Sequence, residues 1–487
     1  MPMYIVALSG EVVLKSRRTR PRFLRRLVSN IEDALRRHGI DGYKVWVDGA
    51  RVFVETPVDV SDVLRRIFGI YRFGEVVELE FKDLRDLAEK VASLAKDMVA
   101  GKKFAVRVHR TGEHDFTSID AAREIGNLLY KYSAGVDLEN PEVEVWVEIR
   151  GDKAYLYKSR IKGPGGLPIG VEGRALVLFS GGFDSPVASW YMARRGVQVD
   201  FLHYIMASPQ SAYLAYKVAR YLAENWLYGY KPRLIIADFR KITEAIREKV
   251  RRSYRQVVLR AIMYIVGERV AKKIGYDALV TGESLGQAAS QTLANLNAIE
   301  KVIDIKTVIL RPLIGFDKEE IIDMSRRIGT HDLSGCVAEF CAIAPTLVTT
   351  KAKVHELENE LNKIPSTIID DVVSNIKIVD ILETKPEELL PEEDIEIDYI
   401  PDEAVIIDLR TKEEYEKWRH PQAIHVSQVK DWNMFKGKTV VLYCDHGHIS
   451  YIQARVLRRQ GIKAYSLRGG LNTLKKLLLK VKNSNHP

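Results

Sequence analysis

The chain has 487 residues, too many for a single hydrophobic core, and its 46% hydrophobic and 29% charged residues are typical of a globular protein with several domains. Its 74 basic and 65 acidic residues give a net charge of +9, which favours a polyanionic partner. The chain has three cysteines, too few for a disulfide framework, so we expect a cytoplasmic location. No apolar run approaches the roughly 18 residues of a membrane span, so we expect neither a membrane protein nor a membrane partner.

The first 75 residues alternate strand and helix patterns. Residues 3–15 predict a strand, and residues 22–39 predict an amphipathic helix that ends at Gly39. A hairpin at 43–56 and a helix at 61–71 are expected to follow. This order is typical of a small α+β unit.

A second unit of the same kind is expected from about residue 76 to residue 165. Its elements are a helix (82–99), a strand (103–110), another helix (118–133) and two strands (143–151 and 153–161). The stretch K-G-P-G-G-L-P-I-G at 162–170 is rich in Gly and Pro, so we place a domain junction there.

The remainder predicts two α/β domains. Residues 175–350 favour a doubly wound parallel sheet, with expected strands at 175–180, 197–204, 232–239 and 277–283. Residues 383–403 carry many carboxylates and almost no basic residues, which indicates a linker. A smaller α/β domain is expected at 404–487, with strands at 404–410, 439–444 and 464–467 and a helix at 449–461.

A glycine loop, S-G-G-F-D-S at 180–185, follows the first strand of the larger α/β domain and precedes a helix. Backbone N–H groups at such a junction favour an anion, and glycine permits its close approach. Because the loop lacks the lysine of an ordinary phosphate loop, it suits a pyrophosphate leaving group better than γ-phosphoryl transfer. Asp184 is a candidate to hold Mg²⁺ or to orient a nucleotide. The alternative is a purely structural Gly-Gly turn.

These residues resemble the PP-loop ATP pyrophosphatase family, whose members adenylate a substrate and release pyrophosphate. Residues 278–296 and 311–322 are similar to the corresponding stretches of the tRNA 4-thiouridine synthetase family, also called the tRNA sulfurtransferases. Further motifs extend the resemblance over essentially the whole chain, at 10–15, 67–73, 104–110, 143–157 and 163–170.

The resemblance implies a domain organisation. It comprises a ferredoxin-like domain (1–60), a THUMP RNA-binding domain (61–165), a PP-loop domain with an adenine nucleotide α-hydrolase-like sheet (171–382), the acidic linker (383–403) and a rhodanese-like domain (404–487).

The resemblance also implies a set of nucleotide contacts. They are Leu178, Phe179, Ser180, Gly181, Gly182, Ser185, His203, Tyr204, Arg260, Gly282 and Gln291. Asp184 and Lys318 would form the charged pair that adenylation requires, since a lysine neutralises charge that develops on the α-phosphate. Taken alone, Lys318 would be read as a surface lysine and Gln291 as a helix-surface residue.

Cys444 stands between a predicted strand and a predicted helix, where backbone N–H groups stabilise a thiolate. Residues 406–426 and 465–471 resemble the entry segment and closing loop of rhodanese domains, which implies that Cys444 carries a persulfide. Many rhodaneses end the active loop with arginine, but Ile449 and Ser450 stand there in this chain. Stabilisation would then rest on backbone N–H groups and on His446 or His448. The alternative is an inert buried thiol.

Cys336 and Cys341 have a spacing compatible with metal binding, but a zinc or iron–sulfur site needs more ligands. Some archaeal relatives are understood to use a cluster held by three cysteines, whereas this domain has two, so no iron–sulfur cluster is expected. E-F-C before A-I-A-P-T matches the family's second functional cysteine, which implies that Cys341 resolves the persulfide and forms a transient disulfide with Cys444. The role of Cys336 stays open.

Basic residues gather in two places. One group surrounds the start of the 22–39 helix and includes Lys15, Arg17 and Arg18, with Phe23, Leu27 and Ile31 expected on the opposite, buried stripe. Another, at 247–255, is expected on one helix beside the sheet. Such runs are usually solvated faces. Together with the THUMP-like segment, which contributes Arg107 and Arg110, they predict a track for RNA phosphates.

The main hypothesis is an ATP-dependent sulfurtransferase that adenylates a uridine of tRNA, by resemblance the one at position 8, and inserts sulfur from Cys444 to give 4-thiouridine. ATP, Mg²⁺ and persulfide sulfur are the expected cofactors. The expected partners are tRNA and a cysteine desulfurase or another persulfide donor, and a homodimer is left open. One alternative is sulfur supply for the thiazole of thiamine. Another is a non-enzymatic RNA-binding adaptor, against which Asp184, Lys318 and the two thiols argue.

Overall fold

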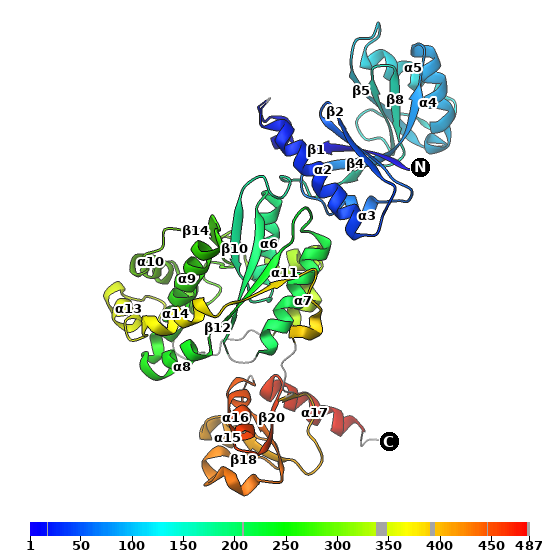
Figure 1. Cartoon of the computed structure of the whole chain (residues 1–487). Coiled ribbons are helices and arrows are strands. Elements are labelled where there is room, and N and C mark those ends of the chain that lie inside the picture. Colours follow the sequence, from blue (N-terminus) through cyan, green and yellow to red (C-terminus); the bar gives the residue numbers. More distant parts are fainter. Residues whose placement is uncertain (17, 207–208, 338–347, 390–394, 446, 485–487) are drawn as a thin grey trace. The chain divides into compact units, whose positions relative to one another are not determined.

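The computed structural model of the chain describes residues 1–487 except residues 17, 207–208, 338–347, 390–394, 446 and 485–487. The described chain forms two compact units (Figure 1). The first comprises residues 1–172, 194–196 and 228–230, and the second comprises the rest. Among the residues described, no helix combines the length and the hydrophobicity that a membrane span requires.

The first unit is built on one nine-stranded sheet. Its order is β2-β3-β1-β4-β8-β7-β5-β6, with β9 beside β4. The strands are β1 (Met3–Leu8), β2 (Lys44–Asp48), β3 (Arg51–Glu55), β4 (Ile70–Glu80), β5 (Lys103–Thr111), β6 (Gly135–Val136), β7 (Val143–Arg150), β8 (Lys153–Tyr157) and β9 (Ile161–Lys162). Because β4 pairs with β1 on one side and with β8 on the other, the sheet is continuous through both predicted α+β regions.

Helices of the first unit pack on this sheet through apolar stripes. They are α1 (Gly10–Val13), α2 (Arg20–Arg37), α3 (Ser61–Leu64), α4 (Leu84–Val99) and α5 (Ser118–Tyr130). The predicted stripe of α2 is confirmed, since Phe23, Leu27 and Ile31 are buried in one cluster with β1 and β3. Helix α5 begins at a capping box, in which Thr117 and Asp120 satisfy each other's backbone N–H groups.

Two expected boundaries in this unit are wrong. The strand predicted at 3–15 ends at Leu8, because the chain turns at Ser9 into the short helix α1. The helix predicted at 61–71 ends at Leu64, and β4 begins at Ile70. Gly69 separates them with φ +98°, which a right-handed helix cannot accommodate, and a Cβ there would lie 2.9 Å from the Pro168 ring.

The second unit contains the predicted doubly wound sheet, which is confirmed. Its order is β14-β13-β10-β11-β12-β15, parallel except for the edge strand β15. The strands are β10 (Arg174–Leu178), β11 (Gln198–Ile205), β12 (Arg233–Asp238), β13 (Ala278–Val280), β14 (Val308–Leu310) and β15 (Lys377–Asp380). Since β11 and β13 flank β10 on opposite sides, the strand order reverses at β10, and a crevice opens at its carboxyl end.

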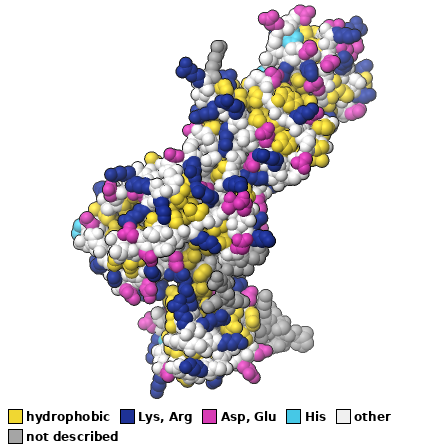
Figure 2. All heavy atoms as spheres, in the orientation of Figure 1, with side chains coloured by type: hydrophobic (Ala, Val, Ile, Leu, Met, Phe, Trp, Pro, Cys, Tyr) yellow, Lys and Arg dark blue, Asp and Glu magenta, His cyan; other side chains and the backbone are white. Residues whose placement is uncertain are grey.

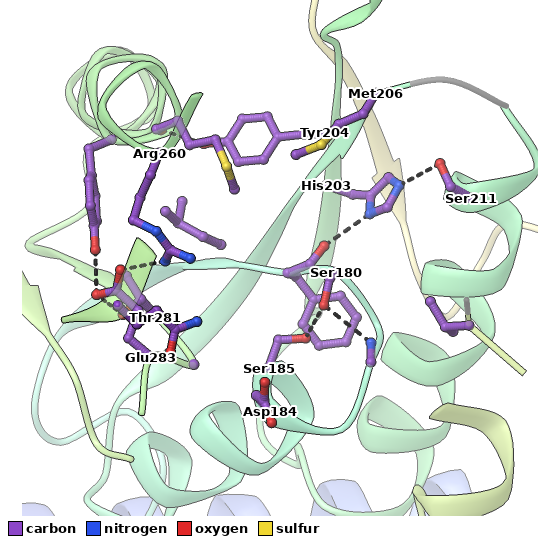
Figure 3. A pocket seen from close by; sticks show the side chains of 18 residues that line it. Ser180, Asp184, Ser185, His203, Tyr204, Met206, Ser211, Arg260, Thr281 and Glu283 are labelled. Atoms are coloured by element: carbon purple, nitrogen blue, oxygen red, sulfur yellow. Dashed lines mark hydrogen bonds and ion pairs between the residues drawn. The ribbon is translucent and has the colours of Figure 1, made fainter. Parts of the chain in front are cut away.

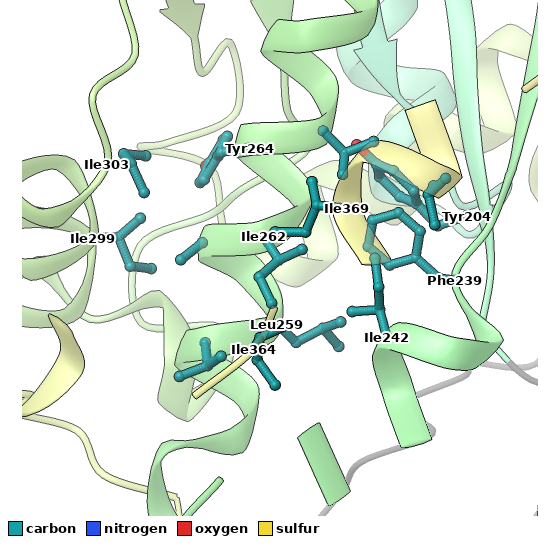
Figure 4. Close-up of a cluster of buried hydrophobic side chains, with 14 of the residues drawn as sticks. Tyr204, Phe239, Ile242, Leu259, Ile262, Tyr264, Ile299, Ile303, Ile364 and Ile369 are labelled. Atoms are coloured by element: carbon teal, nitrogen blue, oxygen red, sulfur yellow. The ribbon is translucent and has the colours of Figure 1, made fainter. Parts of the chain in front are cut away.

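Two sets of helices flank this sheet (Figure 1). One set is α8 (Arg240–Lys249), α9 (Arg255–Ile274), α10 (Leu293–Val302), α13 (Val354–Leu361) and α14 (Ser366–Ser374), which share one hydrophobic cluster (Figure 4). The other set is α6 (Asp184–Arg194), α7 (Gln210–Asn225), α11 (Lys318–Ile328) and α12 (His331–Gly335). Trp226, at the end of α7, meets Trp190 of α6 edge-on at 5.6 Å and donates its indole N–H to Ile328 O of α11 (3.0 Å).

The basic segment 247–255 does not lie on one helix, so that expectation is wrong. Helix α8 ends at Lys249, residues 252–254 form a 3₁₀ turn, and α9 begins at Arg255. Val250 is extended and buried, and the Arg251 N–H donates to Glu360 Oε2 (2.9 Å), so packing redirects the chain between the two helices.

A separate parallel sheet, β16-β20-β19-β17-β18, organises the end of the chain. Its strands are β16 (Glu396–Ile397), β17 (Val405–Asp408), β18 (Ile424–His425), β19 (Thr439–Tyr443) and β20 (Lys463–Leu467). The helices are α15 (Lys412–Lys417), α16 (His448–Arg459) and α17 (Gly470–Ser484). Beneath the sheet's carboxyl edge, buried Asp408 accepts hydrogen bonds from the Arg410 guanidinium and the Tyr443 hydroxyl.

Candidate functional site

A cavity of about 210 Å³ opens at the carboxyl ends of β10, β11 and β13, where the strand order reverses (Figure 3). It is lined by Leu178, Phe179, Ser180, Gly182, Asp184, Ser185, His203, Tyr204, Met206, Ser211, Arg260, Met263, Tyr264, Thr281, Gly282, Glu283, Gln291 and Val337. Of the predicted nucleotide contacts, Gly181 is the one outside this lining, because its Cα faces Ala215 of α7.

The glycine loop joins β10 to α6 in the predicted manner. The Gly181 N–H donates to Ser185 Oγ (3.1 Å), and the Gly182 N–H donates to Ser180 Oγ (3.2 Å). Gly181 has φ +86°, and a Cβ there would lie 2.9 Å from the Ala215 Cα, so both the conformation and the space require glycine. The loop therefore presents serine hydroxyls and the start of α6 to the cavity, a setting that favours an anion.

Gly282 lies against this loop from the neighbouring strand. A Cβ on Gly282 would stand 2.9 Å from the backbone carbon of Asp184 and 3.1 Å from the Ser185 nitrogen. Any side chain at this position would push the end of β13 away from the start of α6. Glycine is therefore what allows the two segments to form one wall of the cavity.

Asp184 and Lys318 are brought together by the fold. Lys318 is the first residue of α11, whose N-terminus is capped by Asp317 and Glu320, and its Nζ lies 3.9 Å from Asp184 Oδ1. Gln287 donates its amide N–H to Asp184 Oδ2 (3.2 Å). The Phe183 ring lies 5.6 Å from Lys318 Nζ, so the cation also rests near an aromatic face.

The donor set beside Asp184 fits a magnesium ion. Carboxylate and amide oxygens are ligand types that Mg²⁺ accepts. Within the described part of the chain, the Gln287 carbonyl oxygen is buried and accepts no hydrogen bond, although its amide nitrogen bonds to Asp184. Asp184 and Gln287 are therefore the residues that could hold the ion.

His203 is a fixed, neutral part of the cavity wall. Its Nδ1–H donates to the Phe179 carbonyl (2.9 Å), and its Nε2 accepts from the Ser211 hydroxyl (3.0 Å). Burial lowers the pKa of His203 to about 4, so the ring is uncharged near neutrality. Tyr204 is fixed through its hydroxyl, which donates to Met263 O (2.7 Å).

Gln291 and Arg260 are held by groups that sequence reasoning did not single out. The Gln291 carbonyl oxygen accepts from the Ser284 N–H (3.2 Å). Arg260 of α9 donates to Glu283 Oε1 (2.5 Å) and to Ser290 Oγ (3.3 Å). Glu283 stands directly after Gly282 in the sequence, so the neighbouring motif residue could have pointed to it.

Cys444 follows β19 and is almost fully buried, with 3% of its surface exposed. Its Sγ lies 3.6 Å from the hydroxyl of Ser450 in α16, and Ser450 Oγ lies 2.8 Å from Ser466 Oγ on β20. Ser466 in turn donates to Gly447 O (3.2 Å). The sequence analysis did not predict these buried hydroxyls next to the sulfur, because Ser466 lies on a different strand, far from Cys444 in the sequence.

The remaining thiols are placed in part. Cys341 lies outside the described residues, as does its expected disulfide with Cys444. Cys336 is exposed at the end of α12, and its Sγ donates to Asp332 O (3.4 Å). In the described part of the chain, no group of three or more His, Cys, Asp and Glu side chains is arranged to hold a metal ion.

The predicted RNA contacts fall on two elements of the first unit. Lys15 and Arg18 precede α2, with Lys15 Nζ 5.3 Å from the Phe23 ring and Arg18 exposed, while Arg17 lies outside the described residues. On β5, Arg107 donates to Glu144 (3.1 Å), and Arg110 contacts His114 Nδ1 (3.1 Å). Figure 2 shows Lys and Arg side chains interspersed with Asp and Glu on the visible face.

Family models match the chain in four places. The model described as thiamine biosynthesis protein (ThiI) matches residues 170–365, and a ThiI ferredoxin-like domain matches residues 4–74. A THUMP domain matches residues 81–158, and a rhodanese-like domain matches residues 397–477.

Curated relatives are similar over nearly their whole length. A tRNA sulfurtransferase of Desulfurococcus amylolyticus is 52% identical over 471 residues, covering 97% of this chain and 98% of the relative. Another tRNA sulfurtransferase, of Pyrobaculum aerophilum, is 40% identical, with 96% of each chain covered. A tRNA sulfurtransferase of Escherichia coli O157:H7 is 36% identical, covering 94% of this chain and 98% of the relative.

Two solved structures are similar to this chain both in fold and in amino-acid sequence. One is a 4-thiouridine synthetase in complex with RNA and bound ATP, at 29% identity and a TM-score of 0.68, covering 78% of this chain and 99% of that chain. The other is PH1313 from Pyrococcus horikoshii, at 26% identity and a TM-score of 0.54, covering 68% of this chain and 100% of that chain.

Proposed function

The chain belongs to the tRNA sulfurtransferase family, and we propose that it uses ATP to adenylate a uridine of tRNA and then replaces O4 with sulfur to give 4-thiouridine. The observation that carries this proposal is the cavity at the carboxyl end of β10. There a glycine loop without a lysine meets Arg260 in the wall and the Asp184–Lys318 pair at the start of two helices. That arrangement suits release of pyrophosphate rather than transfer of a γ-phosphoryl group.

In the first step, the glycine loop holds the pyrophosphate portion of ATP through the Ser180 and Ser185 hydroxyls and the N-terminus of α6. The uridine O4 attacks the α-phosphate, and pyrophosphate leaves. Lys318 neutralises the negative charge that develops at the α-phosphate, and Asp184 keeps the lysine amine in place. A Mg²⁺ ion held by Asp184 and Gln287 would shield the charge of the phosphates.

In the second step, the terminal sulfur of the Cys444 persulfide attacks C4 of the activated base, and AMP leaves. Cys341 then attacks Sγ of Cys444. The S–S bond to the transferred sulfur breaks, 4-thiouridine is released and a Cys341–Cys444 disulfide remains, which a dithiol reductant restores to two thiols. A cysteine desulfurase or another persulfide donor reloads Cys444.

The first unit is proposed to hold the tRNA, with the target uridine at position 8. The THUMP match and the RNA-bound structural neighbour support RNA binding by this unit, and position 8 is inferred from the family resemblance. Lys15 and Arg18 before α2, with Arg107 and Arg110 on β5, would contact RNA phosphates, which carry no sequence information and make binding salt-dependent. The boundaries 1–60, 61–165, 171–382 and 404–487 remain our proposed domain division.

The adenylation step can be tested without a sulfur donor. ATP labelled at the γ-phosphate is incubated with the full chain and an unmodified tRNA, and release of pyrophosphate, the product of this step, is measured against the same mixture without tRNA. We expect pyrophosphate release that depends on tRNA and stops when Asp184 is replaced by Asn. Pyrophosphate release at equal rates with and without tRNA would contradict the proposal.

A second function is favoured by the match to a model described as thiamine biosynthesis protein. The rhodanese-like region could also supply sulfur for the thiazole of thiamine. Thiazole formation in a reconstituted extract would then need Cys444 but tolerate Asp184→Asn, whereas formation of 4-thiouridine would need both residues.

A further inference from the structure

The nucleotide cavity contains a carboxylate for which the proposed chemistry has no direct use. Glu283 follows Gly282 at the end of β13, and only 2% of its side chain is exposed. A site for a polyphosphate disfavours a negative charge, because like charges repel strongly where water is excluded. The presence of Glu283 in this cavity therefore requires an explanation that outweighs the repulsion between its charge and the phosphates.

Four donors surround Glu283. Its Oε1 accepts from Arg260 Nη1 (2.5 Å), and its Oε2 accepts from Arg311 Nε (2.8 Å). The Tyr264 hydroxyl (2.5 Å) and the Thr281 hydroxyl (3.1 Å) also donate to Oε2. Burial raises the pKa of Glu283, but the charge of Arg260, the hydrogen bonds and Arg311 outweigh it and lower the pKa below its usual range, so the group is ionised.

Of the two arginines in this cluster, Arg260 is the one that lines the cavity (Figure 3). Its Nη1 is bonded to Glu283 and its Nη2 to Ser290 Oγ. Among the described residues, nothing accepts a hydrogen bond from its buried Nε. The guanidinium is thus fixed at its far end, while one donor close to the cavity lacks an acceptor. An unpaired buried donor is costly, so a ligand that supplies an acceptor gains affinity there.

We propose that Glu283 is a positioning residue for adenylation: it holds the Arg260 guanidinium so that Nε–H meets an acceptor atom of the bound nucleotide. This inference rests on the proposed function of the cavity. Glu283 also lowers the local positive charge, because its carboxylate lies between Arg260 and Arg311 and offsets part of their combined charge. Without Glu283, the two guanidinium groups would repel each other and Arg260 would lose its fixed direction.

The test uses the full chain and compares Glu283→Gln with Glu300→Gln. Glu300 is half exposed and pairs with Arg311 Nη2 (2.6 Å), so its variant perturbs the same arginine without touching Arg260. For Glu283→Gln we expect KM for ATP in tRNA-dependent pyrophosphate release to rise about 10- to 100-fold, the value of a hydrogen bond to a charged group, with kcat changed much less. For Glu300→Gln we expect an unchanged KM.

Two further measurements separate positioning from stability and from the proposed function. In an Arg260→Ala background, Glu283→Gln should add no further increase in KM, because its partner is absent. Calorimetric titration with ATP alone gives the same comparison without turnover, so absence of tRNA-dependent pyrophosphate release would overturn the proposed function while leaving the role of Glu283 testable. An unchanged ATP affinity in folded Glu283→Gln, or equal losses in both backgrounds, would overturn the inference.

Discussion

Lys318 Nζ lies 3.9 Å from Asp184 Oδ1, and the two side chains come from the first residues of two helices, α11 and α6. A helix N-terminus carries partial positive charge, which adds to the charge of the lysine amine. Asp184 offsets that charge before a nucleotide binds, and its second oxygen is held by the Gln287 amide. The pair therefore fixes a cation at the point where the glycine loop meets the cavity.

Replacing Lys318 by Met should abolish transition-state stabilisation while leaving most nucleotide contacts in place. We expect kcat for tRNA-dependent pyrophosphate release to fall about 100-fold or more, with a small change in ATP affinity, because the lysine acts on charge that develops during the reaction. Lys301→Met, at an exposed site in the last turn of α10, is the matched control and should leave kcat unchanged. A similar loss in both variants would show that net charge, and not the Asp184 contact, matters.

Gly282→Ala should damage the cavity without adding any charge. The new methyl group would stand 2.9 Å from the Asp184 backbone carbon, which cannot move without shifting the start of α6. We expect tRNA-dependent pyrophosphate release to fall about 100-fold, the scale of an ångström-level misplacement. Gly315→Ala is the control, because a Cβ there meets nothing within 4 Å and the backbone is not left-handed. Wild-type activity in Gly282→Ala would contradict the close packing of β13 against α6.

His203 should make stability depend on pH in a defined direction. Burial lowers its pKa from 6.5 to about 4, so the unfolded chain binds a proton at a higher pH than the folded chain does. The stabilising contribution is complete above pH 6.5 and is lost as the pH falls towards 4, by about 3 kcal/mol over that window. Thermal midpoints measured from pH 7 to pH 4.5 should fall less steeply for His203→Asn than for the wild-type chain. Parallel curves would exclude His203 as the cause.

Ser450 should assist Cys444 in carrying sulfur. Its hydroxyl lies between Cys444 Sγ (3.6 Å) and Ser466 Oγ (2.8 Å), so it can accept from a thiol or donate to a thiolate. Ser450→Ala should slow alkylation of Cys444 by iodoacetamide about tenfold, measured by mass spectrometry of the peptide that contains Cys444. Ser427→Ala, at an exposed hydroxyl near His425, is the control. Equal alkylation rates for the two variants would rule out the contact.

Sequence patterns predicted most of the fold because its strands are short apolar runs separated by turn residues. The doubly wound parallel sheet and the glycine loop at the carboxyl end of β10 were both expected. The failures have tertiary causes. The break at 250–254 depends on burial of Val250 and on the contact of the Arg251 N–H with Glu360, a residue far along the chain. The hydrophobic periodicity of residues 247–255 gives no information about Glu360.

Some residues of the site were predicted from the sequence and others were missed, for a similar reason. Asp184 and Gly282 stand in recognisable motifs, and the fold places them in one wall. Glu283 was missed because its importance lies in its partners Arg260, Tyr264 and Arg311, which come from α9 and from the residue after β14. Its role becomes visible only when the helix and the two strands are brought together. The same holds for Ser466, which lies on a different strand from Cys444.

The most direct test of the account is nucleoside analysis of an unmodified tRNA after incubation with the full chain, ATP, Mg²⁺ and a persulfide donor. Chromatography with mass spectrometry should detect 4-thiouridine with the wild-type chain. Asp184→Asn should give none because adenylation stops, and Cys444→Ser should still release pyrophosphate from ATP but give no thiolated base. Absence of 4-thiouridine from the wild-type chain, or its formation by Cys444→Ser at the wild-type rate, would contradict the account.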